Sequence, residues 1–206
     1  VKTRPDFFAE EERSRQPSVF SVIRKTFELF RSGDPYLGLY GAFGYDLVYQ
    51  FEKIEAKHKR DPEQTDCHLF LPVELVVVDR QKEEAYKIEY HIDTPDGMTE
   101  SWWNTGDEFP LVSGKADGKI KCDHESGEFE KKVKQIQEGC RRGDFFEVVL
   151  SQTFSTGFAE QPSNLFQRIC EQNPSPYSFL INMGAEQLVG ASPEMYVRVK
   201  EDRFET

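Results

Sequence analysis

Residues 143–158 read GDFFEVVLSQTFSTGF, and this stretch decides the fold that the sequence predicts. Phe and Val, which favour strands, dominate its first half. A long strand is therefore expected over Phe145–Phe158. Gly143 precedes this strand and closes a segment with helical periodicity, so the strand follows directly on a helix.

Helices are predicted on both sides of this strand. The first opens at Ser126 and ends near Gly143, after two arginines that favour a helix C-terminus, and the second spans Ser163–Gln172. Their inward faces consist of Phe129, Val133, Ile136 and Cys140 in the first helix and Leu165, Ile169 and Cys170 in the second. Further strands are expected at Ser178–Asn182, Gln187–Val189 and Tyr196–Val199. This order indicates an α+β fold with large, mostly antiparallel sheets flanked by helices.

The first part of the chain shows the same two kinds of element. Apolar residues recur on one face over Pro17–Phe30, which predicts a helix capped by Ser18. Glycines alternate with bulky residues over Leu37–Tyr45, a pattern that suits a strand approached closely by another backbone. A short helix capped by Asp46 is expected to follow and to end at Phe51.

A hairpin and a linker complete this first part. Two strands at Leu69–Asp79 and Ala85–Ile92 are joined by a polar connection of hairpin length, and the first of them is expected to be buried on both faces. From Asp93 to Gly118 the composition turns to small and polar residues around Trp102-Trp103, which indicates a linker. We therefore expect one region over residues 1–118 and a second over residues 119–206.

Composition excludes several classes of protein. The 206 residues are 37% hydrophobic, which is enough for a core and argues against wholesale disorder. Their formal net charge of −11 and pI of about 4.9 argue against nucleic-acid binding, because a phosphate backbone would repel such a surface. No apolar run approaches the length of a membrane span, and the first residues do not resemble a signal peptide. A cytoplasmic location is expected.

Cysteine and histidine usage does not predict a metal site. The four cysteines are dispersed without a CxxC pair, so free thiols are expected rather than a disulfide framework. Cys67-His68 is an adjacent Cys/His pair, but it lacks a second pair at metal-ligand spacing. No metal ligand is therefore assigned to any residue.

Three segments carry residues that a plain structural role does not require. Glu147 interrupts the apolar strand, either as a buried carboxylate bound to a partner or on a partly solvated face. Two prolines stiffen residues 173–179, which indicates a rigid ligand wall or a plain helix-to-strand turn. Residues 190–194 place Glu194 after a proline-fixed turn, as a positioned acid or base or as an incidental residue of a surface hairpin.

Taken in order, these segments resemble one known family. GDFFEVVLSQ (143–152), NPSPYSF (173–179) and GASPE (190–194), each preceded by the expected elements, closely resemble the chorismate-utilising enzymes, specifically anthranilate synthase component I. Upstream, LGLYGAFGYDLVYQFE (37–52) and LFLPVELVVVD (69–79) resemble that family's N-terminal region, in the form fused to a glutamine amidotransferase.

The resemblance implies roles for particular residues. The family's enzymes are lyases that use Mg²⁺ and convert chorismate and glutamine-derived ammonia to anthranilate and pyruvate in tryptophan biosynthesis. Glu194 matches the glutamate of the Ser-Pro-Glu motif, the proposed general acid that protonates the departing ring hydroxyl. Pro176, Tyr177 and Ser178 match the Pro-Tyr-Met that lines the L-tryptophan feedback site, and Ser178 there removes an apolar wall. Glu147 stands where isochorismate synthases carry a water-activating lysine, which argues against isochorismate and salicylate synthases.

The resemblance also implies missing parts and partners. Residues 119–206 would be the beginning of the chorismate-binding catalytic domain, and the Mg²⁺ ligands, the catalytic histidine and the chorismate-carboxylate contacts would lie beyond Thr206. We therefore expect the 206 residues alone to be inactive. A homo-oligomer with an amidotransferase domain or subunit is expected.

Two alternatives remain open at this point. One is aminodeoxychorismate synthase of the folate pathway, whose distinguishing lysine would follow Thr206, and the other is a non-catalytic regulatory module that binds an amino acid. The sequence immediately after Thr206 would separate both from anthranilate synthase.

Overall fold

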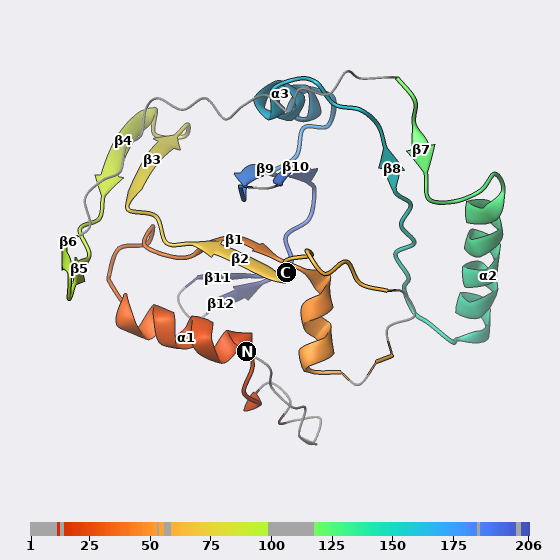
Figure 1. Ribbon diagram of the computed structural model, residues 1–206, viewed down its shortest axis with the longest axis horizontal. Helices are drawn as coiled ribbons and strands as arrows, with labels where there is room; N and C mark the ends of the chain where they lie inside the picture. The colour runs from red at the N-terminus through yellow and green to blue at the C-terminus, as the bar shows by residue number, and fades with distance from the viewer. Residues whose placement is uncertain are drawn as a thin grey trace. The chain divides into compact units, whose positions relative to one another are not determined.

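The computed structural model describes residues 12, 15–52, 54–55, 59–98, 118–184, 186–200 and 203–206. The chain divides into two compact units, Val1–Thr105 and Gly106–Thr206, and each contains helices and strands (Figure 1). Every strand pair in the described residues is antiparallel, which confirms the predicted α+β class. Within the described residues each sheet has only two strands, so these residues do not form the large sheets that the sequence predicts.

The helices of the first unit lie where the sequence predicts them. Helix α1 spans Val19–Leu29 and begins directly after Ser18, whose backbone N–H donates to Ser21 Oγ at 3.2 Å. The predicted helix at Asp46 is a 3₁₀ helix, η2 (Tyr45–Gln50). Gly44 rather than Asp46 is its N-cap, because the Gly44 N–H donates to the Asp66 carbonyl at 2.7 Å and so fixes the chain two residues earlier.

Three two-stranded antiparallel sheets complete the first unit. Their strands are β1 (Tyr40–Phe43) with β2 (Cys67–Phe70), β3 (Glu74–Asp79) with β4 (Glu84–Glu89), and β5 (Asp93–Thr94) with β6 (Gly97–Met98). The close approach expected at the glycine-rich strand is present, because a Cβ on Gly41 would clash with the backbone carbonyl of His68. The β5–β6 hairpin corrects the prediction that the linker begins at Asp93. Trp102-Trp103 and the rest of that predicted linker up to residue 117 lie outside the described residues.

The prediction that β3 is buried on both faces is wrong. Val76 and Val78 are 62% and 64% exposed, whereas Leu75 and Val77 are half-buried. Alternate side chains of a strand point to opposite faces, and the described residues of the first unit cover one face of β3. An apolar run shows that a strand could be buried on both faces, but it does not show whether other residues cover both faces.

Aromatic contacts form the core of the first unit. The Phe20 ring on α1 lies 5.6 Å from the Phe43 ring and 5.8 Å from the Phe51 ring, measured between centroids. Among the described residues, Leu47 on η2 is the one hydrophobic side chain that is buried, with 6% of its surface exposed. Helix α1, strand β1 and the residue that ends η2 therefore pack through one small aromatic cluster.

The second unit is built around two helices. These are α2 (Glu128–Arg142) and α3 (Pro162–Gln172), and the strands are β7 (Lys121–Cys122), β8 (Phe154–Ser155), β9 (Tyr177–Asn182), β10 (Gln187–Ser192), β11 (Arg198–Lys200) and β12 (Arg203–Glu205). The inward position predicted for Cys140 is wrong, since this residue is exposed. Its neighbour Gly139 is buried instead, because the Phe145 ring lies where a side chain at that position would be.

The long strand predicted over Phe145–Phe158 is also wrong for the described residues. Only Phe154–Ser155 forms a strand, paired with β7. Phe146 is 103% exposed and Val149 is 86% exposed. A strand needs a neighbour for its backbone hydrogen bonds, and the described residues offer this stretch only the two residues of β7.

Helix α3 packs against the β9–β10 hairpin, as Figure 1 shows. The half-buried face of α3 includes Leu165, Ile169 and Cys170, as predicted. On the hairpin, the Phe179 ring lies over Gly190, where an added Cβ would come within 2.5 Å of it. This helix and hairpin fix the position of residues 173–179 and 190–194, two of the three segments that the sequence singles out.

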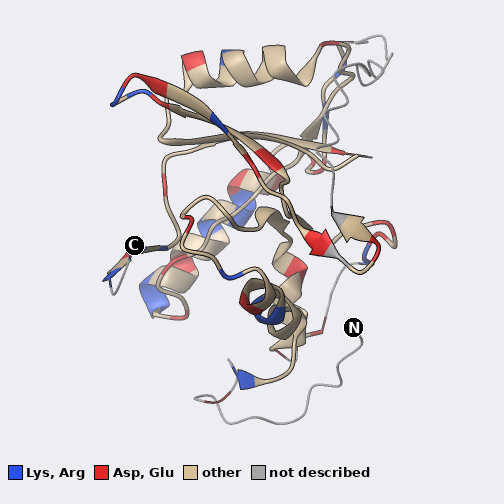
Figure 2. Cartoon of the chain, turned by 90° about the vertical axis from the view of Figure 1, so that its left-hand side faces the viewer, with Lys and Arg blue, Asp and Glu red and all other residues tan. Residues whose placement is uncertain are grey.

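Acidic and basic residues are interspersed along the described elements (Figure 2). Several form exposed ion pairs, such as Lys132 with Glu128 at 2.8 Å on α2. Among the described residues, none of the helices combines the length and the apolar composition that crossing a membrane requires.

Candidate functional site

The β9–β10 hairpin decides where the predicted site residues lie. In its antiparallel register Tyr177 pairs with Ser192, and Ser178 pairs with Ala191. Successive side chains of a strand point to opposite faces, so Tyr177 and Ser192 share one face and Ser178 lies on the other. Glu194 follows Ser192 by two residues, beyond the last pair of the ladder.

An open hollow lies at this end of the hairpin. It has a volume of about 800 Å³ and is lined by Pro176, Tyr177, Ser192, Pro193, Glu194, Met195, Tyr196 and Thr206. The structure therefore brings the predicted general acid together with two of the three residues predicted to bind L-tryptophan. Glu194 is the acidic side chain in this lining, and two tyrosines provide aromatic surface.

Ser178 is not among the residues that line the hollow. It is half-buried, and its hydroxyl donates to the Ser175 carbonyl at 3.3 Å. Ser178 thus stabilises the proline-containing turn from the side opposite to Tyr177. Its role in tryptophan binding stays a prediction.

The turn that carries Glu194 is held by short local contacts. Ser192 Oγ donates to the Glu194 carbonyl at 2.9 Å and accepts from the Glu194 N–H at 3.3 Å. The Tyr177 hydroxyl donates to Met195 Sδ at 3.5 Å. The two bonds to Ser192 fix the backbone of Glu194, whose exposed carboxyl side chain is part of the lining of the open hollow. Such a carboxyl group can exchange a proton with a bound ligand.

Glu147 lies apart from this arrangement. It is exposed, on the extended stretch between α2 and β8, and it does not line the hollow. The partly solvated face was one of two interpretations that the sequence left open for Glu147, and the structure supports that one.

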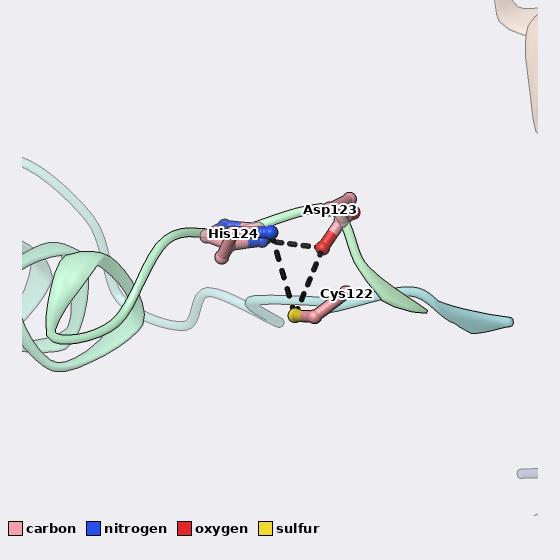
Figure 3. Close-up of side chains that lie close together, drawn as sticks. All are labelled: Cys122, Asp123 and His124. Carbon is pink, nitrogen blue, oxygen red and sulfur yellow. Dashed lines mark hydrogen bonds and ion pairs between the residues drawn. The ribbon is translucent and has the colours of Figure 1, made fainter. Parts of the chain in front are cut away.

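A second cluster of chemistry-bearing side chains lies at Cys122, Asp123 and His124 (Figure 3). The His124 Nδ1 and Asp123 Oδ1 atoms are 2.5 Å apart, and Cys122 Sγ lies 3.9 Å from Asp123 Oδ1. The His124 side chain is only 9% exposed. Sequence reasoning missed this cluster, although the Cys-x-His spacing at 122–124 was a signal for it.

Protein groups already occupy the ligand atoms of this cluster. Lys132 Nζ lies 2.9 Å from His124 Nε2, and since an ammonium group only donates, the imidazole proton is on Nδ1 and points to Asp123. Hydrogen bonds from His124 and from the Thr153 backbone N–H lower the pKa of Asp123 to about 2. A metal ion bound at Nδ1 would force a proton onto Nε2 and break the contact with Lys132.

The cluster therefore acts as a clamp between two segments. The Asp123 N–H donates to the Thr153 carbonyl at 3.1 Å, and Gln152 Nε2 donates to Cys122 Sγ at 3.0 Å. These contacts hold β7 against the residues that precede β8. Its thiol and imidazole could suit zinc, but only after these protein contacts were exchanged for the metal.

Tyrosines form a further polar cluster in the first unit. The Tyr90 hydroxyl donates to Asp34 Oδ2 at 3.0 Å, and the Tyr86 hydroxyl donates to the Tyr36 hydroxyl at 3.0 Å. Desolvation and the bond to Asp34 raise the pKa of Tyr90 to about 12, and the bond to Tyr36 raises the pKa of Tyr86 to about 12. The raised pKa values keep Tyr86 and Tyr90 neutral at pH 7, and their bonds tie the loop before β1 to β4 and the residue after it.

Comparisons with known proteins agree on one family. A family model described as chorismate binding enzyme matches residues 4–206. The anthranilate synthase of Azospirillum brasilense is 46% identical over 198 residues, which cover 95% of this chain and 27% of that protein. Anthranilate synthase component 1 of Aquifex aeolicus is 32% identical over 186 residues, which cover 82% of this chain and 37% of that protein.

A solved structure shows the same likeness. The crystal structure of anthranilate synthase component I from Streptococcus pneumoniae matches 83% of this chain and 42% of that chain, with a TM-score of 0.60 and 26% identity. The chain thus spans between about a quarter and two fifths of the length of these relatives.

Proposed function

Because this chain belongs to the family of chorismate-binding enzymes, we propose that it is part of an anthranilate synthase. In the proposed reaction chorismate and ammonia give anthranilate, pyruvate and water. The observation that carries the proposal is the hollow at the end of β9–β10, which joins Glu194 to Pro176 and Tyr177. The likeness to the Azospirillum brasilense anthranilate synthase over 95% of this chain supports it.

Glu194 acts as the general acid in this proposal. Ammonia forms a bond to a ring carbon, the ring C–O bond breaks, and the oxygen leaves as water with a proton from Glu194. Hydroxide is a poor leaving group, so a carboxylic acid that delivers the proton lowers the barrier; general acid–base groups typically contribute about 10²–10⁴-fold in rate. Glu194 is exposed here, so other parts of the complete enzyme would have to cover the hollow and exclude water.

The proposal includes partners that lie outside this chain. Ammonia would come from glutamine through an amidotransferase domain or subunit. L-tryptophan would inhibit the enzyme by binding at Pro176–Ser178, where Pro176 and Tyr177 line the hollow and Ser178 supports the turn through its bond to the Ser175 carbonyl. A homo-oligomer in the cytoplasm is part of the same proposal. The hollow supports the tryptophan site through Pro176 and Tyr177, which offer a rigid turn and an aromatic ring.

The described residues do not fit the Mg²⁺ of the family. Mg²⁺ prefers oxygen ligands in octahedral geometry, whereas the candidate ligand cluster found among the described residues, at 122–124, includes a thiol and an imidazole. Glu194 contributes a single carboxyl group to the lining of the hollow. We therefore assign Mg²⁺ to other parts of the complete enzyme and route no step through it.

The test uses the complete enzyme, which we define as a protein of the full length of the relatives that contains this chain. Incubated with chorismate, ammonium and Mg²⁺, it should produce fluorescent anthranilate and an equal amount of pyruvate, while the 206-residue chain should produce neither. Chromatography of the product separates the ortho amine from the para amine that an aminodeoxychorismate synthase forms. A para product, or binding of an amino acid without turnover, would overturn the proposal.

A further inference from the structure

Ser192 holds the backbone of Glu194 at both of its polar groups. A single hydroxyl accepts from the Glu194 N–H at 3.3 Å and donates to the Glu194 carbonyl at 2.9 Å. Between the two residues stands Pro193, whose ring fixes one backbone dihedral. The turn that presents Glu194 therefore has few ways to move while the Ser192 hydroxyl is present.

Ser192 is itself anchored in the sheet. It is the last residue of β10 and pairs with Tyr177, the first residue of β9. On the far side of Glu194, Met195 Sδ accepts a hydrogen bond from the Tyr177 hydroxyl at 3.5 Å. The Glu194 turn is thus fastened at both ends to the same two paired residues.

We propose that Ser192 is a positioning residue that aims the Glu194 carboxyl group at the substrate. This inference rests on the proposed function, in which Glu194 delivers a proton. Among the described residues the Glu194 carboxyl has no hydrogen-bond partner, so the backbone turn is what fixes the point from which this side chain reaches the hollow. Proton transfer requires a distance of about 2.6–3.2 Å between the heavy atoms, so a shift of the turn separates the acid from the leaving oxygen.

The expected effect follows from that geometry. A misplacement of about 1 Å in a catalytic group can cost as much as about 10²-fold in rate. In the complete enzyme, Ser192→Ala should lower kcat by about 10–100-fold and change the KM for chorismate by less than about threefold. Ser192→Thr keeps the hydroxyl and should recover kcat to within about threefold of wild type. Ser192→Cys keeps the size but hydrogen-bonds weakly, and should resemble Ser192→Ala.

A double-mutant cycle separates positioning from a general structural role. If Ser192 acts through Glu194, then Ser192→Ala should have no further effect on kcat in the Glu194→Gln background. A structural role would reduce kcat by the same factor in both backgrounds. Ser163→Ala, which removes an exposed hydroxyl at the start of α3, is the matched control and should leave kcat unchanged.

The kcat values of these variants decide whether Ser192 positions Glu194. Wild-type kcat in Ser192→Ala, failure of Ser192→Thr to restore kcat, or additive losses in the cycle would overturn the positioning role while leaving Glu194 as the acid. Wild-type kcat in Glu194→Gln would instead overturn the proposed role of Glu194, and the positioning of that residue with it. If Ser192→Ala does not fold, Ser192→Cys and Ser192→Thr decide the question by the same comparison.

Discussion

Two segments of the second unit are equally typical of strands in sequence, but only one of them forms paired strands. Strands β9 and β10 pair over six residues each, and α3 packs against them. Residues 145–152 are as apolar but pair with no strand among the described residues, and Phe146 and Val149 are almost fully exposed. The difference is the neighbour, because backbone groups of a strand must be satisfied by another strand or by water. Apolar composition alone does not supply that neighbour.

The two segments also carry the two glutamates that the sequence singled out. Glu194 follows the paired hairpin, where the ladder and Ser192 determine its position. Glu147 lies in the unpaired stretch and is exposed. A catalytic role is therefore better supported for Glu194 than for Glu147. Five experiments can test the contrast between the paired hairpin and the unpaired stretch.

The largest effect is expected from the carboxyl groups themselves. In the complete enzyme, Glu194→Gln should lower turnover by about 10²–10⁴-fold with little change in the KM for chorismate, because glutamine cannot deliver a proton. Glu147→Gln is the matched variant on the unpaired stretch and should stay within about threefold of wild type. Anthranilate fluorescence measures both rates. A loss at Glu147 as large as that at Glu194 would break the comparison.

The second effect concerns the aromatic side chain in the hollow. Tyr177→Ala should weaken inhibition by L-tryptophan by about tenfold or more, since about 60 Å² of apolar surface at 25 cal/mol per Å² contributes roughly 1.5 kcal/mol. Ser178→Ala should change inhibition by less than about threefold, because Ser178 lies outside the hollow lining. Inhibition curves on both variants decide this. Equal losses of inhibition in the two variants would show that Ser178 also contacts tryptophan. A wild-type enzyme that tryptophan does not inhibit would contradict the proposed tryptophan site.

The third test addresses the packing of the hairpin. A Cβ at Gly190 would lie 2.5 Å from the Phe179 ring, so Gly190→Ala should destabilise the 206-residue chain by about 1–3 kcal/mol, as overpacking usually does. The urea denaturation midpoint measures this loss. Glu186→Ala, at the exposed turn of the same hairpin, serves as the control. An unchanged midpoint for Gly190→Ala would show that the Phe179 ring does not lie over Gly190 in solution.

A smaller effect, confined to a range of pH, is expected at the clamp beside the unpaired stretch. The pKa of Asp123 is lowered to about 2, so its carboxylate stabilises the fold fully above its ordinary pKa of 3.8, and this stability is lost as pH falls through about 2. Asp123→Asn should therefore lower the melting temperature at pH 7, and the gap from wild type should close between about pH 4 and pH 2. Asp96→Asn, an exposed turn residue of the first unit, is the control. A gap that persists unchanged at pH 2 would show that the clamp does not depend on the charge of the Asp123 carboxylate.

The smallest effect is expected in the unpaired stretch itself. Phe146 is fully exposed, so Phe146→Ser should change the unfolding free energy of the 206-residue chain by no more than about 0.5 kcal/mol. Urea denaturation with Gly190→Ala in the same series gives the direct contrast. A loss above about 1 kcal/mol would show that Phe146 packs against a partner in solution.

Local signals determined much of the fold. Ser18 as the residue before α1, the inward residues of α3 and the glycine that admits a neighbouring backbone at position 41 all follow from short-range chemistry. The family resemblance likewise pointed to Glu194, Pro176 and Tyr177, which the structure places in one hollow. Caps, helix faces and tight turns depend on residues within a few positions of one another, so the sequence contains the information needed.

Tertiary structure decided what depends on distant partners. The sequence could not show that residues 145–152 lack a pairing strand among the described residues, or that Val76 and Val78 are exposed, because burial and pairing require a neighbour from elsewhere in the chain. It also could not show that Ser178 lies opposite Tyr177, since that follows from the β9–β10 register. The bonds of Ser192 to Glu194 became visible only once the turn had a definite geometry, and hydrogen bonds depend on tenths of an ångström that composition does not specify.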